Sequence, residues 1–209
     1  MHSQSVVFIV AGAAATQRDL IARVDPLGIA RKVCRSADEF LAALTPAGPS
    51  CVLAELPRNA QGDMHWLQRL ARKTPRLPIV VIASHGDVPT AVAAMKLGIL
   101  DFLETKCSDA QFGDAIAAAM RWDAENRRRI ARIDRIRRRL ARLNAGQRAV
   151  LDLLLAGKCN REAAAELKLS VRAIEERRAK VMQIMRAESL AELVRLAVLA
   201  ESEGTSHGH

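Results

Sequence analysis

The first half of the chain alternates short, continuously apolar runs with segments in which apolar residues recur every three or four positions. Runs of the first kind indicate buried strands, and they occupy residues 6–10, 51–56, 79–83 and 99–103, with a weaker one at 29–33. Segments of the second kind indicate helices, and they lie at 17–25, 37–45, 63–73 and 88–97. Because the two kinds alternate, we predict an α/β domain with a five-stranded, doubly wound parallel sheet. Ligands of such domains bind beyond the carboxyl ends of the strands.

The second half of the chain is helical in pattern throughout. One long helix is expected from Asp109 to Leu143, because neither Pro nor Gly follows Gly113 in that stretch. Four short helices are expected after it, since the pattern breaks three times, near 157–160, 168–170 and 186–189. We therefore predict a sheet domain at 1–120, a linker helix at 121–142, an all-α four-helix domain at 143–200 and a disordered tail at 201–209.

An apolar stripe runs along the linker helix and allows two interpretations. Six positions step by three and four residues, namely Asn126, Arg129, Ile133, Ile136, Leu140 and Leu143. The last four are apolar, as the seam of a coiled coil requires, so the helix could mediate self-association. Alternatively, one amphipathic helix packs this stripe on a neighbouring domain.

The net charge of +9 is concentrated in the same helix. Residues 121–142 hold ten Arg against three acids, whereas basic and acidic residues nearly balance in the rest of the chain. Such a segment either attracts a polyanionic partner or forms a solvated charged face.

Composition narrows the class of protein further. Aromatic residues make up 3% of the chain, which argues against a base-stacking nucleic-acid binder or an aromatic cofactor cage. With no apolar run of 18 residues and no basic leader, we expect a cytoplasmic protein without membrane contact. The four cysteines lack CxxC spacing, and no nucleophile–base pair or metal cluster is apparent. We therefore expect no enzyme, no metal and no cofactor.

The helical domain carries a specific set of residues at two turns and in a helical core. They are Leu143, Val150, Leu151, Gly157, Asn160, 163–167, Leu169, Ser170, Arg172, Ile174, Glu175, Val181, Met185, Ser189, Leu190 and 192–194. This set resembles the LuxR-type helix-turn-helix of FixJ/NarL-type response regulators. The resemblance implies a scaffold helix at 163–167, a cap at Ser170 and a recognition helix at 171–185 that enters the major groove.

Side chains of this recognition helix are the candidate DNA contacts. They are Arg172, Glu175, Glu176, Arg177, Arg178 and Lys180. The four cations suit phosphates, and glutamate can accept from cytosine N4. The two adjacent acids depart from the family pattern and would repel the DNA backbone, so a domain that has lost DNA affinity is the alternative.

The sheet domain resembles the receiver domain of the same regulators, most clearly across 84–89 and at Ala93, Met95, Lys96, Gly98, Asp101 and Phe102. The resemblance implies aspartyl phosphorylation assisted by Mg²⁺. The five positions that would carry this chemistry instead hold Ala11, Gly12, Glu55, Ala83 and Thr105. We therefore predict a degenerate receiver that is not phosphorylated.

Three further positions are left with alternative roles. Glu55 either mimics a phosphoaspartate or is an ordinary strand-end carboxylate paired with Lys106 or water. The 88–106 face, which includes Phe102, is a candidate surface for a protein partner, or plain core. Cys159 stands at the start of the scaffold helix, where a helix N-terminus stabilises a thiolate, so it is a candidate redox site or an inert small residue.

The sequence thus predicts a phosphorylation-independent, DNA-binding transcriptional regulator that forms a homodimer on paired half-sites. The alternative is a protein-interaction adaptor whose receiver-like domain binds a kinase or another regulator.

Overall fold

The computed structural model describes residues 5–45, 48–56, 60–84 and 87–202. The chain divides into two compact units, Met1–Arg127 and Arg128–His209. Among the described residues, no helix combines the length and the apolar character that crossing a bilayer needs.

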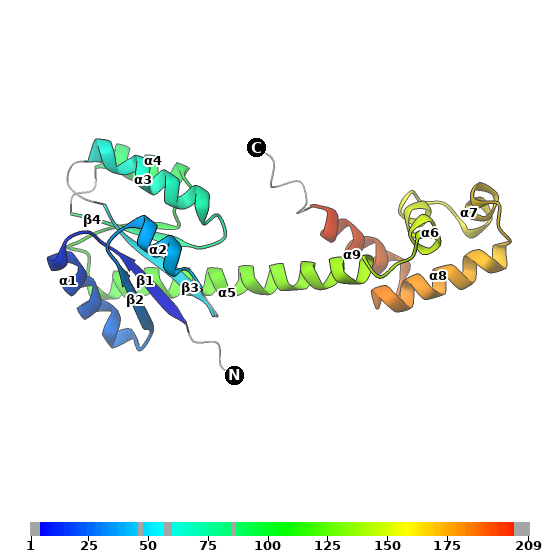
Figure 1. Ribbon diagram of the computed structural model, residues 1–209, viewed down its shortest axis with the longest axis horizontal. Helices are drawn as coiled ribbons and strands as arrows, with labels where there is room; N and C mark the ends of the chain where they lie inside the picture. The colour runs from blue at the N-terminus through cyan, green and yellow to red at the C-terminus, as the bar shows by residue number, and fades with distance from the viewer. Residues whose placement is uncertain (1–4, 46–47, 57–59, 85–86, 203–209) are drawn as a thin grey trace. The chain divides into compact units, whose positions relative to one another are not determined.

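The first unit is built on a parallel five-stranded sheet (Figure 1). Its strands are β1 (Val6–Val10), β2 (Ala30–Cys34), β3 (Ser50–Leu56), β4 (Ile79–Ala83) and β5 (Asp101–Glu104), in the spatial order β2-β1-β3-β4-β5. This confirms the predicted fold class. The last strand was expected at 99–103 but begins at Asp101, because Ile99 packs in the core before the chain aligns with β4.

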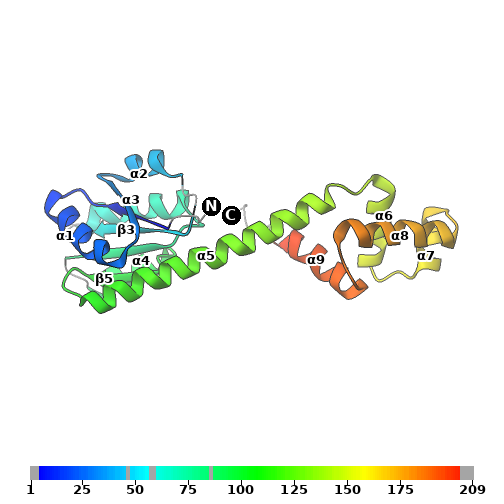
Figure 2. The ribbon, with the colours of Figure 1, turned by 90° about the horizontal axis from the view of Figure 1, so that it is seen from below.

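Helices cover both faces of the sheet. They are α1 (Ala14–Val24), a 3-10 turn (Asp25–Leu27), α2 (Ala37–Ala43), α3 (Ala60–Lys73), α4 (Val88–Lys96) and α5 (Asp109–Leu140). Side chains alternate along each strand, so each face has its own apolar core. Phe40, Leu67 and Ala94 from α2, α3 and α4 pack on one face, and Leu20 and Phe112 from α1 and α5 pack on the other. Figure 2 shows α5 alongside the sheet.

A buried carboxylate attaches α5 to the sheet. Asp123 is 1% exposed and accepts hydrogen bonds from the Ser50 backbone N–H at 2.8 Å and from Arg127 Nε at 2.5 Å. Asn126 Nδ2 donates to the Arg76 carbonyl at 3.3 Å. Since buried polar groups need partners, these bonds set the position of the helix along β3.

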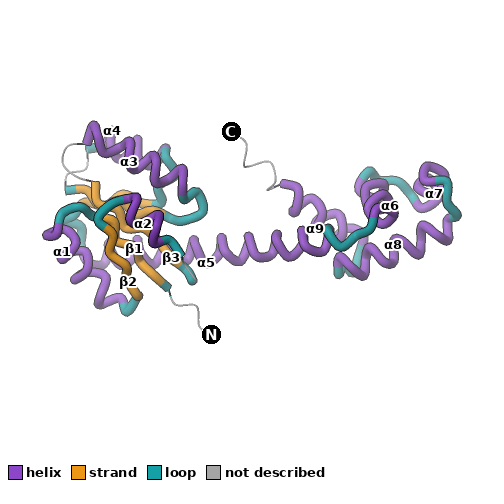
Figure 3. Tube along the Cα trace, in the orientation of Figure 1, coloured by secondary structure: helices purple, strands orange, loops and turns teal. Residues whose placement is uncertain are grey.

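The described part of the second unit is helical (Figure 3). After the end of α5 it contains α6 (Ala145–Leu155), α7 (Asn160–Leu167), α8 (Val171–Met185) and α9 (Leu190–Ser202), which confirms the predicted four-helix domain. Their apolar faces share one core that includes Val150, Leu151, Ile174, Val181 and Leu193.

Two predicted boundaries in this unit were wrong. Helix α5 ends at Leu140 rather than Leu143, because Asn144 and Gln147 form a capping box that starts α6. Helix α9 includes Glu201 and Ser202, which we had placed in a disordered tail. Residues 203–209 of that tail lie outside the described part of the chain.

The apolar stripe of α5 packs inside its own unit. Ile133 and Ile136 are 1% and 2% exposed, and Leu140 and Leu143 lie against the core of the four helices. These apolar residues thus pack on the four helices of the same unit, as the second interpretation expected for an amphipathic helix.

Candidate functional site

The carboxyl edge of the sheet brings together the five residues predicted to stand where a receiver has its phosphorylation site. Ala11 and Gly12 follow β1, Glu55 lies near the end of β3, Ala83 ends β4, and Thr105 follows β5. Because the strands are parallel and in register, with Glu55 opposite Ile82, these residues meet at one edge. Glu55 is the one carboxylate among the five.

The Glu55 carboxylate is bonded to the start of α1. Its Oε2 accepts from the backbone N–H groups of Gly12 at 3.1 Å and Ala13 at 3.4 Å, and its Oε1 accepts from the Thr16 hydroxyl at 2.6 Å. The N-cap residue of α1, Ala13, has no side chain able to cap the helix. Glu55 therefore serves as a cap from another strand and places a negative charge at the positive end of the helix.

The other two strand-end residues, Ala83 and Thr105, are hydrogen-bonded to each other. The Thr105 hydroxyl donates to the Ala83 carbonyl at 3.1 Å, and the Thr105 N–H donates to the same oxygen at 2.8 Å. Lys106 is exposed, and the partners of Glu55 are those of α1 instead. The hydrogen bonds of Glu55 among the described residues go to the start of α1, and none joins it to Lys106, one of the two partners expected beside water.

Sequence reasoning missed a residue that holds the loop after β5. The Arg23 guanidinium donates to the carbonyls of Thr105 at 3.3 Å and Cys107 at 2.9 Å, and it lies 4.3 Å from the centre of the Phe112 ring. Arg23 stands on α1 in an ordinary amphipathic pattern, so no local signal marked it. This side chain keeps Thr105 in place.

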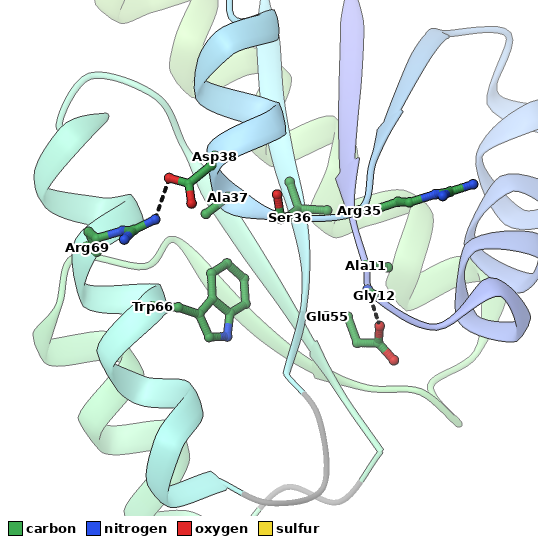
Figure 4. A pocket seen from close by; sticks show the side chains of 10 residues that line it. Ala11, Gly12, Arg35, Ser36, Ala37, Asp38, Glu55, Trp66 and Arg69 are labelled. Carbon is green, nitrogen blue, oxygen red and sulfur yellow. Dashed lines mark hydrogen bonds and ion pairs between the residues drawn. The ribbon is translucent and has the colours of Figure 1, made fainter.

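A cleft of about 300 Å³ opens beside Glu55 (Figure 4). Its walls include Gly12, the Trp66 indole and the Asp38–Arg69 ion pair. The small residues Ala11 and Gly12 leave this space open, since no atom lies within 4 Å of where a β-carbon on Gly12 would stand.

The second candidate site is the pair of helices α7 and α8. Lys168, in the left-handed conformation at φ 54°, ends α7, and the Ser170 hydroxyl caps α8 by accepting from the Ala173 N–H at 3.2 Å. The turn between them joins a short helix of 8 residues to one of 15. This is the geometry of a helix-turn-helix, in which the second helix enters the major groove.

Helix α8 presents four of the candidate contacts to solvent and holds two closer to the fold. Arg172, Glu175, Glu176 and Lys180 are exposed, whereas Arg177 and Arg178 are half-buried. Arg172 and Glu176 form an exposed ion pair at 3.4 Å, which offsets two of the charges on this surface.

The two half-buried arginines lie against residues of α7 and α6. Arg178 Nη1 donates to Asn160 Oδ1 at 3.2 Å. Arg177 lies over Gly146, where a β-carbon would come within 2.8 Å of Nη1. An open groove of about 630 Å³ runs here between α8 and the start of α6. In the sequence, the glycine at position 146 was the one sign that another side chain comes close to this position.

Cys159 is exposed and forms the N-cap of α7. Its backbone N–H donates to Glu162 Oε2 at 2.7 Å. This bond, the contact with the Cys159 side chain and the nearby Lys158 charge lower the pKa of Glu162.

The 88–106 face carries an exposed apolar stripe on α4. Val88, Val92 and Met95 are 76%, 47% and 49% exposed, and their spacing places them on one side of the helix. Phe102 is half-buried against the core.

A receiver-type sheet domain followed by a helix-turn-helix domain defines a DNA-binding response regulator. Residues 142–197 match the family described as bacterial regulatory proteins, luxR family. Relatives include the transcriptional regulatory protein FixJ of Azorhizobium caulinodans, 36% identical over 186 residues that cover 89% of this chain and 88% of the relative. FixJ of Bradyrhizobium diazoefficiens is 34% identical and covers 96% and 98% of the two chains.

Two solved structures extend the likeness across both domains. The response regulator StyR superposes with a TM-score of 0.78 at 26% identity, covering 93% of this chain and 98% of StyR. Full-length FixJ from B. japonicum gives a TM-score of 0.53 at 35% identity, covering 94% and 97%. The chain belongs to the FixJ family of transcriptional regulatory proteins.

Proposed function

We propose that this member of the family is a phosphorylation-independent, sequence-specific DNA-binding regulator that acts as a cytoplasmic homodimer. In this proposal residues 1–120 are a degenerate receiver, 121–142 a basic linker helix and 143–200 the DNA-binding domain. The observation that carries the proposal is the bonding of Glu55 to Gly12, Ala13 and Thr16, since it commits the one carboxylate of the site to a structural task.

Phosphoryl transfer to a carboxylate needs charge compensation at the acceptor. Mg²⁺ favours several oxygen ligands, but Ala11 and Gly12 offer no side-chain oxygen at the end of β1. Ala83 lacks a hydroxyl, and the Thr105 hydroxyl is donated to the Ala83 carbonyl. The same gaps argue against Glu55 as a mimic of phosphoaspartate, because a mimic would need those partners to transmit its charge.

Sequence-specific DNA binding rests on the surface of α8. The exposed Arg172 and Lys180 are suited to phosphates, and Glu175 is suited to cytosine N4. Arg178 is held by Asn160, so little side-chain entropy is lost when it binds.

A homodimer follows from the paired half-sites that helix-turn-helix proteins read. The apolar stripe of α5 is buried within the chain at Ile133 and Ile136, so the dimer must use another surface. The exposed α4 stripe of Val88, Val92 and Met95 in the 88–106 face is an apolar surface open to a protein partner.

The alternative function is an interaction adaptor. The adjacent Glu175 and Glu176 favour it, because they lower the attraction of α8 for DNA. In that case the 88–106 face would bind a kinase or another regulator, and DNA binding would be weak and insensitive to sequence.

Genome-wide selection of DNA fragments by the purified, unphosphorylated protein over a salt series distinguishes the two. The regulator predicts recovery of discrete sites whose binding persists at moderate salt. Recovery of fragments without a shared sequence, lost at moderate salt, would favour the adaptor.

A further inference from the structure

The C-terminal half of α5 carries a face of arginines that the functions above do not use. Its members on the helix are Arg128, Arg132, Arg135 and Arg139, which step by four, three and four residues, and Arg142 follows just after the helix ends at Leu140. Side chains at this spacing lie on one side of a helix, and the four on α5 extend over ~17 Å, at 1.5 Å per residue. We call this set the arginine face.

The orientation of the arginine face is set by packing within its own unit. Ile133 and Ile136, on another side of α5, are buried at 1% and 2% exposure. Arg137 donates to the Ala200 carbonyl at 3.0–3.1 Å from Nη2 and Nε. Because these contacts fix the rotation of α5, four of the five members of the arginine face are exposed, and Arg139 is half-buried.

The positive charge of this face has no carboxylate against it. Among the described residues, no ion pair with an acid is recorded for any member of the arginine face. Between 128 and 142 the sequence holds a single acid, Asp134, which lies on another side of the helix. The described part of the chain thus pairs none of these guanidinium groups with a carboxylate.

The arginine face adjoins the end of the recognition helix. Arg139 Nη1 donates to the carbonyl of Met185, the last residue of α8, at 3.0 Å. Burial, together with the positive charges of Arg186 and Arg135, lowers the pKa of Arg139. Arg135 and Arg139 therefore lie close to Arg186, the C-cap residue of α8.

We propose that the arginine face binds the DNA phosphate backbone beside the site that α8 reads. The inference rests on the proposed DNA-binding function and deepens it. Duplex DNA carries a phosphate about every 3.4 Å along each strand, so its backbone matches an extended row of guanidinium groups. The exposed surface of α8 has Glu175 and Glu176 beside Arg172 and Lys180 and is close to neutral. The arginine face supplies the attraction that this surface lacks.

The test removes charge from the arginine face and from a matched surface in the full-length chain. The test variant is R132Q/R135Q/R142Q. The control variant is R18Q/R72Q/K96Q, which removes the same charge from exposed positions of the sheet domain. A third variant, R132K/R135K/R142K, retains the positive charge. Gln and Lys are good helix formers, and circular dichroism verifies the helix content of each protein.

DNA affinity is measured by fluorescence anisotropy over a salt series, with the selected site and a scrambled duplex. Each lost phosphate contact lowers the slope of log K against log salt by about 0.9. The test variant should lose about 2–3 in slope and bind both duplexes at least tenfold more weakly at low salt. The control and the charge-retaining variants should keep the wild-type slope.

The outcomes separate this inference from the proposed function. If wild type selects a site and the test variant keeps its slope, the arginine face is not a DNA contact while the regulator stands. If wild type shows no sequence preference and the test variant still loses its slope, the arginine face is supported and sequence-specific regulation falls. A wild-type chain that binds no DNA at low salt would overturn both.

Discussion

The Thr16 hydroxyl on α1 donates a 2.6 Å hydrogen bond to the Glu55 carboxylate on β3. Two backbone N–H groups, from Gly12 and Ala13, complete the set of partners. Glu55, which the sequence predicts at the acceptor position of a receiver, therefore caps a helix that has no side-chain cap of its own. Glutamate in place of aspartate is a conservative change in sequence, but the Glu55 carboxylate bonds to the start of α1.

Replacing Glu55 should cost stability and leave DNA affinity unchanged. Glu55→Ala should lower the free energy of unfolding by about 1 kcal/mol, as the loss of a helix cap does. Glu55→Gln keeps an acceptor for Thr16 and should lose less. Urea denaturation followed by tryptophan fluorescence measures this, with Asp38→Ala as an exposed control in the same cleft. A fall in DNA affinity for folded Glu55→Ala would instead support the phosphoaspartate mimic.

Asp123 should be the acid on α5 that matters most for stability. Its carboxylate is buried and accepts from the Ser50 N–H and from Arg127. Asp123→Ala would leave that N–H without a partner and should cost about 2–3 kcal/mol. Asp134→Asn, at an exposed position of the same helix, should change the unfolding free energy by less than ~0.5 kcal/mol. Equal losses for the two variants would contradict the anchoring role.

Thiol labelling should separate the cysteines. Burial, and then the negative charge of Asp123, raises the pKa of Cys51 to about 12, so its thiolate is scarce at neutral pH. Cys159 is exposed and should react first, and Cys159→Ser should remove that fast phase. Rapid labelling of Cys51 in the folded protein would contradict this order. The candidate redox role of Cys159 further requires that its oxidation change DNA affinity.

The start of α7 should weaken in acid. The hydrogen bond from the Cys159 N–H lowers the pKa of Glu162 below its ordinary value of 4.5. A depressed carboxyl pKa adds stability that is present above the unfolded value and disappears as pH falls through the folded value. The Cys159 amide resonance should therefore shift with an apparent pKa below 4.5. Glu162→Gln should abolish that titration, and exposed Glu166→Gln should not. A titration at or above the ordinary value would contradict the capping role.

The sheet followed from the sequence because its strands are continuously buried. Parallel strands covered on both faces read as apolar runs, and β1 and β4 match their predicted bounds at Val6–Val10 and Ile79–Ala83. The end of α5 did not follow, because its apolar stripe continues to Leu143. The Asn144 capping box outweighs that stripe at the helix boundary.

The hydrogen-bond partners of the site residues could not be predicted from the sequence pattern. Glu55 and Thr16 are 39 positions apart, and Asp123 and Ser50 are 73 apart, so no local period connects them. Resemblance predicts the five receiver positions, but the hydrogen bonds of Glu55 depend on the side-chain cap that α1 lacks. The sequence likewise could not decide between the two interpretations of the α5 stripe, because the choice depends on how the helices after α5 fold back against it.

The central claim is that this FixJ-family protein binds specific DNA without phosphorylation. The most direct measurement is the dissociation constant for its selected site with and without acetyl phosphate and Mg²⁺, with intact-protein mass spectrometry of each sample. We predict one unchanged mass, without an added phosphoryl group, and the same affinity in both conditions. A phosphorylated species that binds the site more tightly than the unmodified protein would contradict the account.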